Sequence, residues 1–180
     1  AHVLDDVQAI FGFHVCPALD AGIIGLKEGA LTAAVDRFTF TFHGKSAHGA
    51  HPEDGLDPVP MLASFVLAVQ TIVSRTLPPK SSALVSLTHI ASGSTWNIIP
   101  ADAMAEGTVR CFSKATQSRI QQLMVELAEG SARANGASAT VTYDAAYAAT
   151  VNAAAEADLA IAAASAVSGE AMVITNADPA

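Results

Sequence analysis

The sequence predicts an α+β fold in which a ferredoxin-like βαββαβ module is flanked by two pieces of an α/β domain. Between about residues 34 and 148, segments that alternate apolar and polar residues interleave with two segments of helical periodicity in that order. A short apolar run precedes the module, and an alanine-rich helix and a short strand follow it. We therefore expect three parts, namely 1–33, 34–148 and 149–180.

The composition fits a folded domain and excludes several classes of function. Of 180 residues, 51% are hydrophobic and 14% are charged, which rules out a disordered chain. The net charge of −8 is opposite to that of proteins that track phosphates, so we expect no nucleic-acid partner. No uncharged apolar run is long enough to cross a membrane, so we expect no membrane association. Two cysteines make no disulfide framework, which favours the cytoplasm.

The first segment combines an apolar run with a loop. Residues 7–15 are mostly apolar and predict a strand buried on both faces, and residues 17–29 predict a loop. His14 stands at the carboxyl end of the predicted strand, where ligands bind in open α/β sheets, and imidazole is a common metal ligand. A lone histidine beside a loop is more often structural, so the residues alone favour a structural role for His14.

The central module begins with a strand and a helix. In Val35–His43, three phenylalanines alternate with polar residues, which predicts a half-buried strand. The helix begins after Asp57, a favourable N-cap, with Pro58 at its first position, and runs to about Leu77. Its apolar stripe consists of Leu62, Phe65, Val66, Val69, Ile72 and Val73.

The loop at 44–58 is rich in glycine and proline and carries His48 and His51. Glycines let a backbone approach a ligand closely, so this loop is a candidate for binding or catalysis. The His-X-X-His spacing alone is a weak metal motif, because neither an accompanying glutamate-bearing helix nor a cysteine pair is present.

The second half of the module contains a predicted hairpin, a helix and a strand. The strands are 82–91 and 101–112, the helix begins at Ser113 or Thr116 and ends at Asn135-Gly136, and the last strand is 137–147. In the third segment, residues 151–168 predict a helix and 172–174 a short strand.

Two polar residues of the hairpin form another candidate site. Asn97 lies in its loop and Arg110 on its second strand. An amide and a guanidinium close together suit an anionic or carbonyl-bearing ligand, but a turn-forming Asn97 and a surface Arg110 are equally consistent with the spacing. We expect structural roles for four other residues, namely His43, His89, Trp96 and Cys111. His89 is expected on the apolar face of its strand.

Six ordered motifs carry a resemblance that covers nearly the whole chain. They are Phe11–Pro17, Gly44–Pro52, Leu56–Pro58, Gln70–Arg75, Asn97–Pro100 and Gly107–Arg110. The sequence resembles the metallopeptidase family of aminoacylases, hippurate hydrolases, succinyl-diaminopimelate desuccinylases and auxin-amino-acid conjugate hydrolases, and especially its hippurate hydrolase-like branch.

The resemblance implies a fragment of a homodimeric amidohydrolase that acts on N-acyl amino acids. Residues 34–148 would be the lid and dimerisation domain, and 1–33 and 149–180 would be catalytic-domain segments. His14 would bind one of two divalent metal ions, zinc or manganese. His48 would reach the partner's active site and stabilise the oxyanion with Asn97, and Arg110 would bind the substrate carboxylate. The family's other metal ligands and general-base glutamate lie outside these motifs, so we expect the fragment alone to be inactive.

Two alternatives come from other classes of protein. The module could be a non-catalytic dimerisation module that pairs through an edge strand and its first helix. This alternative is compatible with the amidohydrolase hypothesis. An RNA-recognition domain has the same element order, but it needs exposed aromatics and a basic surface. The phenylalanine triplet is expected to face the helices and the charge is −8, so we set RNA aside.

Overall fold

The chain divides into two units in the computed structural model, which describes residue 2 and residues 4–178. The central unit comprises residues 33–149, and the flanking unit is formed by the segments before and after it. The chain therefore leaves the flanking unit once, builds the central unit without interruption, and returns. Each unit has its own sheets.

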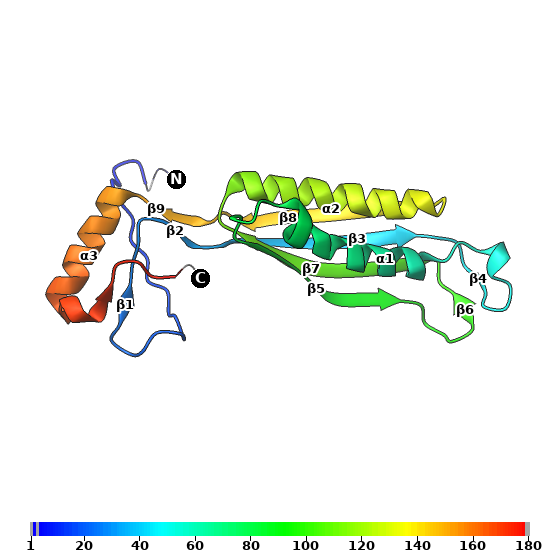
Figure 1. Cartoon of the computed structure of the whole chain (residues 1–180), viewed down its shortest axis with the longest axis horizontal. Coiled ribbons are helices and arrows are strands. Elements are labelled where there is room, and N and C mark those ends of the chain that lie inside the picture. Colours follow the sequence, from blue (N-terminus) through cyan, green and yellow to red (C-terminus); the bar gives the residue numbers. More distant parts are fainter. Residues whose placement is uncertain (1, 3, 179–180) are drawn as a thin grey trace. The chain divides into compact units, whose positions relative to one another are not determined.

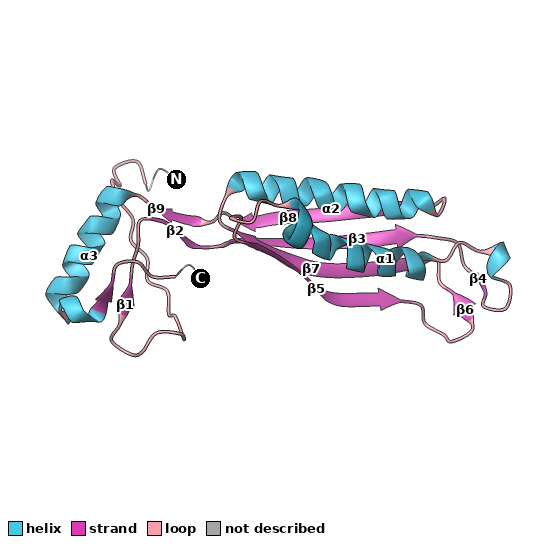
Figure 2. Cartoon of the chain, in the orientation of Figure 1, coloured by secondary structure: helices cyan, strands magenta, loops and turns pink. Residues whose placement is uncertain are grey.

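A four-stranded antiparallel sheet and two helices make up most of the central unit (Figures 1 and 2). In chain order these elements are β3 (Ala34–His43), α1 (Pro58–Thr71), β5 (Ala83–Ser92), β7 (Asp102–Cys111), α2 (Lys114–Ala134) and β8 (Ser138–Tyr147). The strand order across the sheet is β5-β7-β3-β8. Consequently β5 and β8 are the edge strands, and β3 and β7 are the central pair.

The core lies between one face of this sheet and the two helices. Phe38, Phe40 and Phe42 of β3 are 0–1% exposed, as their alternation predicts. Phe65 of α1 packs against two of them, with ring centroids 4.6 Å from Phe40 and 5.5 Å from Phe42. Gly107 of β7 leaves room for Phe38, because a Cβ there would lie 2.4 Å from the Phe38 ring. The opposite face of the sheet is polar and is called the open face below.

The helix ends follow the predicted chemistry. The side chain of Asp57 accepts a hydrogen bond from the backbone N–H of Val59 at 2.9 Å, which caps α1. Ser113 caps α2 by accepting from the N–H of Thr116 at 3.1 Å, so Ser113 is the N-cap of the two candidates. Gly136 takes a φ of +72° just after α2, a conformation that glycine adopts without strain.

The first helix of the central unit continues into a π-helical turn, Ile72–Thr76. By length and composition, Pro58–Thr76 is apolar enough to cross a membrane. One side of the helix is instead buried in the core of the central unit, through Met61, Leu62, Phe65, Val69 and Ile72. Only 28% of this apolar stretch is buried, so a substantial apolar surface of α1 stays exposed.

A β-bulge in β5 overturns one expectation. The register shifts between Leu87 and His89, which pair with Gly107 and Glu106, so Thr88 is the extra residue. The prediction that His89 lies on the apolar face of its strand is wrong, because the bulge turns His89 to the open face. There its Nδ1 lies 3.2 Å from a carboxylate oxygen of Glu106.

The flanking unit contains two short strand pairs and one helix. Strand β1 (Ile24–Gly25) pairs in parallel with β10 (Val173–Ile174), and β2 (Gly29–Thr32) pairs antiparallel with β9 (Thr150–Asn152). The helix α3 (Ala154–Ser168) is followed by a 3-10 turn, Glu170–Met172. The expected loop at 17–29 thus contains β1 and the first residue of β2. Their pairing depends on residues more than a hundred positions later, which local composition does not reveal.

The strand expected at 7–15 is absent from the structure. These residues have no regular secondary structure and are exposed, with Phe13 97% and Val15 85% accessible. A strand buried on both faces needs paired neighbours and covering layers, and none of residues 4–178 pairs with this segment. His14 therefore follows an irregular segment.

Candidate functional site

Two loops at one end of the central unit are joined by a short ladder. Strand β4 (Ala47–His48) pairs antiparallel with β6 (Ile98–Ile99), so that His48 lies opposite Ile98. The N–H of Gly49 donates to the carbonyl oxygen of Asn97 at 2.8 Å. A Cβ at Gly49 would come within 3.1 Å of that oxygen, so glycine permits this close approach. The ladder thus brings the backbone at His48 and Asn97 close together, although 49 positions separate them in the sequence.

The hydrogen bond of His48 determines which ring nitrogen is available. The backbone N–H of Ala50 donates to Nδ1 of His48 at 3.1 Å. Since Nδ1 accepts, the proton of the neutral imidazole lies on Nε2. His48 is exposed, so Nε2 is a donor that a ligand can reach.

Asn97 presents its amide group in a comparable way. The hydroxyl of Thr95 donates to Oδ1 of Asn97 at 3.2 Å, which leaves the Nδ2 amide available as a donor. The two loops therefore carry two neutral donors at one end of the sheet. Such donors suit an oxygen atom that acquires negative charge during a reaction.

Two aromatic side chains lie in the same loops. The ring centroid of His51 is 5.9 Å from that of His48, and Nδ1 of His51 is 3.5 Å from a carboxylate oxygen of Glu53. Trp96 precedes Asn97 and is 95% exposed. A structural role is expected for Trp96, but its ring is exposed and contributes almost nothing to the core of this chain.

Arg110 lies on the open face near the other end of the sheet. Its Nη1 donates to the hydroxyl of Thr108 and, at 3.0 Å, to the carbonyl oxygen of Val109. Within the described part of the chain, no carboxylate lies within 4.0 Å of its guanidinium. A half-buried arginine without an acidic partner is a suitable binding group for an anion.

The structure does not bring Arg110 to His48 and Asn97 within one chain. The loop with Asn97 precedes Asp102, at the first end of β7, whereas Arg110 pairs with Val35 near the start of β3. Arg110 lies eight positions after Asp102 along the extended strand, a distance of roughly 27 Å. Arg110 thus lies where the chain enters and leaves the central unit, and the two donors lie at the far end.

The carboxylate of Glu106, at the middle of the open face, already has partners. Hydrogen bonds from His89 and Arg37 hold the pKa of Glu106 below its ordinary value, and the bond from Arg37 is 3.0 Å long. Thr39 donates to the same carboxylate at 3.3 Å. Glu106 is therefore a structural acid and does not neutralise Arg110.

His43 has the structural role that its sequence position predicts. Its Nδ1 lies 2.6 Å from Asp102 of β7, and its Nε2 lies 2.7 Å from the hydroxyl of Thr140 of β8. The ring thereby connects three adjacent strands. Cys111 is fully buried, and burial raises the pKa of its thiol.

His14 is exposed and has one hydrogen bond. Its Nδ1 lies 2.7 Å from the carbonyl oxygen of Val15, which can only accept, so Nδ1 carries the proton and Nε2 keeps its lone pair. Metal-binding histidines commonly donate to a carbonyl in this way. No group of three or more His, Cys, Asp or Glu residues that could hold a metal ion occurs among the residues that the structure describes. His14 therefore fits as one ligand, and these residues do not complete a site.

The structure adds residues that sequence reasoning missed. Thr95 and Thr108 bind the side chains two positions later, Asn97 and Arg110, and the N–H of Ala50 orients His48. The separation of two positions is a weak signal, because it places side chains on one face only where the backbone is extended.

Comparison with known proteins gives consistent matches. Residues 32–136 match the family model of the peptidase dimerisation domain. The chain is 42% identical over 139 residues to N-acetylcysteine deacetylase of Bacillus subtilis, covering 77% of the chain and 37% of that protein. It is 34% identical over 152 residues to N-acyl-L-amino acid amidohydrolase of Geobacillus stearothermophilus, covering 84% and 41%.

A solved structure extends the likeness beyond the central unit. It is a dinuclear metal-binding peptidase of the M20 family from Bacillus subtilis, with a TM-score of 0.76 and 32% identity, covering 99% of the chain and 44% of that structure. The chain thus spans about two fifths of the length of these relatives.

Proposed function

The chain belongs to the M20 peptidase family and contains its peptidase dimerisation domain, and from this premise we propose that it is part of a cytoplasmic metal-dependent amidohydrolase. The substrates are N-acyl amino acids or related conjugates, which are hydrolysed at the amide bond. Two relatives support this choice, since one is named a deacetylase and the other an amidohydrolase of N-acyl amino acids.

In this proposal the central unit is a ferredoxin-like lid. The strand order β5-β7-β3-β8, with both helices on one face, supports that assignment of 34–148. The segments 1–33 and 149–180 are then parts of a catalytic domain, whose remaining sequence is supplied by the longer protein.

The observation that carries the proposal is the pair of outward donors at His48 and Asn97. In amide hydrolysis, attack on the carbonyl carbon places negative charge on the carbonyl oxygen. Nε2–H of His48 and the Nδ2 amide of Asn97 are held in advance by Ala50, Gly49 and Thr95, so they stabilise that oxygen with little reorganisation.

The free carboxylate of the substrate is bound by Arg110. Because roughly 27 Å of strand separate Arg110 from Asp102, at the end of β7 where the donor loops lie, one lid cannot place both on one small substrate. Each active site therefore takes His48 and Asn97 from one protomer and Arg110 from the other. This arrangement makes dimerisation a requirement for catalysis.

A metal centre is part of the proposal, and His14 is the residue of this chain that would hold a metal ion through Nε2. Two divalent ions, zinc or manganese, would activate water and polarise the scissile carbonyl. Among the described residues, the imidazole of His14 is the one metal ligand that we assign. The other ligands belong to the rest of the protein in this proposal.

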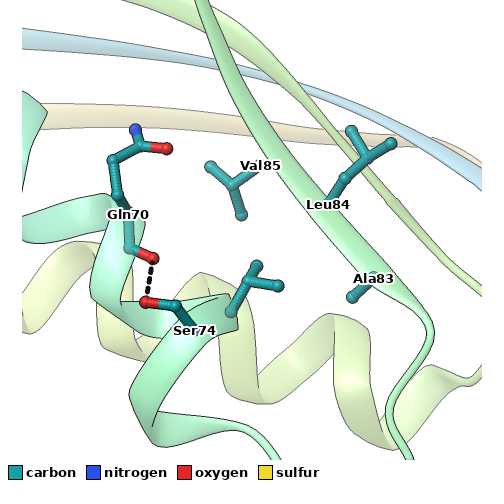
Figure 3. A pocket seen from close by; sticks show the side chains of 6 residues that line it. Gln70, Ser74, Ala83, Leu84 and Val85 are labelled. Atoms are coloured by element: carbon teal, nitrogen blue, oxygen red, sulfur yellow. Dashed lines mark hydrogen bonds between the residues drawn. The ribbon is translucent and has the colours of Figure 1, made fainter. Parts of the chain in front are cut away.

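A second copy of the chain is the expected partner of the β5 edge. An open groove between the end of the first helix and this edge strand is lined by Gln70, Val73, Ser74, Ala83, Leu84 and Val85 (Figure 3). Leu67, three residues before Gln70 on α1, is 74% exposed, and Leu84 is 46% exposed. Pairing of two β5 edges with two α1 helices would cover this surface. A purely non-catalytic dimerisation module is the second candidate, favoured by the same surface.

The substitution His48→Ala in the full-length enzyme tests the catalytic proposal. We expect kcat for an N-acetyl amino acid to fall roughly 10²–10³-fold, because one oxyanion donor is lost, while the metal content stays unchanged. His89→Gln is the matched control, since His89 lies on the open face and is expected to affect kcat little. Unchanged turnover in the His48 variant, or loss of metal with it, would contradict the assigned role.

A further inference from the structure

The guanidinium of Arg110 is connected to the core through the hydroxyl of Thr108. The hydroxyl proton of Thr108 is used in a 2.8 Å hydrogen bond to the backbone carbonyl oxygen of Asp36. Its oxygen lone pair then faces Arg110 and accepts from Nη1. Both residues lie on the open face of β7, two positions apart, so the contact follows from the strand geometry.

The anchor point on β3 is itself rigidly held. Asp36 is 1% exposed, and its carboxyl group accepts hydrogen bonds from Gln117 at 2.6 Å and from Tyr143 at 2.5 Å. These partners come from α2 and β8, so two further elements hold this part of β3. Thr108 therefore links Arg110 to a point in the core that has little freedom to move.

The anchoring bonds occupy one edge of the guanidinium. Nη1 makes both hydrogen bonds that the structure gives Arg110, to Thr108 and to the Val109 carbonyl oxygen. Nη2 and Nε remain as a parallel pair of donors, which is the geometry that binds a carboxylate through two hydrogen bonds. An arginine with an unanchored Nη1 would have to lose side-chain freedom when it binds its ligand.

We propose that Thr108 is a positioning residue that orients Arg110 for two-pronged binding of the substrate carboxylate. The inference rests on the proposed function of Arg110 and adds the residue that orients its guanidinium toward a carboxylate. Thr108 does not touch the substrate. It acts by holding Nη1 so that Nε and Nη2 face the ligand before binding.

The test measures steady-state kinetics of the full-length enzyme with two substrates, an N-acetyl amino acid and the matching N-acetyl amino acid amide, which lacks the carboxylate. We expect Thr108→Val to raise KM about tenfold for the acid and to leave kcat within about twofold. Its KM for the amide should not change. Thr108→Ser keeps the hydroxyl and should restore the KM for the acid.

Two further variants separate the possible outcomes. Arg110→Gln should raise KM for the acid by more than Thr108→Val does. Thr142 of β8 also lies on the open face of the sheet, and Thr142→Val should alter neither KM. If Arg110→Gln leaves the acid and amide equally bound, the proposed carboxylate role of Arg110 is wrong. If Arg110→Gln acts as expected but Thr108→Val does not, or if Thr108→Val weakens acid and amide alike, the positioning role is wrong. Melting temperatures of all variants identify any loss of folded protein.

Discussion

The phenol of Tyr143 donates a hydrogen bond to the buried carboxyl group of Asp36 at 2.5 Å, across the two adjacent strands β8 and β3. Gln117 of α2 donates to the other carboxyl oxygen. No arginine or lysine within residues 4–178 forms an ion pair with Asp36, so this buried acid depends on neutral donors. Burial and the bond to Asp36 raise the pKa of Tyr143 well above its ordinary value.

Removal of the Tyr143 hydroxyl should destabilise the central unit. Tyr143→Phe leaves one oxygen of Asp36 without a donor, so we expect the free energy of unfolding to fall by about 1–3 kcal/mol. Urea denaturation at neutral pH measures this change. Tyr147→Phe is the control, because Tyr147 is 70% exposed and should be neutral to stability. Equal stabilities of the two variants would show that the buried bond contributes nothing.

The same tyrosine predicts how stability depends on alkaline pH. A group with a raised pKa in the folded state stabilises fully below its unfolded pKa, which is about 10 for tyrosine, and loses that contribution as pH rises. The free energy of unfolding should therefore decrease above about pH 10, and the decrease should be shallower in Tyr143→Phe. In Tyr143→Phe the free energy of unfolding should still decrease with rising pH, because Cys111 also has a raised pKa. Identical slopes for both proteins would contradict the assignment.

Self-association should depend on the exposed side of α1. We expect the chain to sediment as a dimer and Leu67→Glu to shift it to monomer, because the substitution buries a charge at the proposed interface. Leu159→Glu on α3 is the control, since Leu159 is similarly exposed, at 60%, but lies outside the central unit. Sedimentation equilibrium over a range of concentrations measures both. A chain that stays monomeric at high concentration would contradict the proposed dimer.

The 180-residue chain by itself should not hydrolyse N-acyl amino acids. The described residues offer one imidazole for metal, and a two-metal centre needs several ligands. Amino acid release should therefore stay at background with added zinc or manganese. The full-length enzyme assayed in parallel provides the positive control. Metal-dependent turnover by the chain alone would show that the catalytic machinery is more complete than proposed.

Much of the central unit follows from local patterns. The alternation in Val35–His43 correctly identifies the buried phenylalanine face, and Asp57 correctly marks the beginning of α1. Periodicity succeeds there because each element has one buried and one exposed face, so the pattern of side chains reflects the fold directly.

Prediction is less successful where pairing decides the structure. The bulge at Thr88 reverses the face of His89, and no residue type marks it in the sequence. The apolar run 7–15 has the composition of a buried strand but no strand beside it among the residues that the structure describes. In both cases the outcome depends on hydrogen bonds to distant segments.

The sequence alone determined the order of elements in the central unit, its core face and the candidates His14, His48, Asn97 and Arg110. Only the tertiary structure decided which of these candidates lie together. The β4–β6 ladder brings the loops of His48 and Asn97 together, while the length of β7 keeps Arg110 at the other end of the sheet. The physical reason is that residue type and periodicity are local properties, whereas the distance between side chains depends on strand register and strand length across the whole sheet.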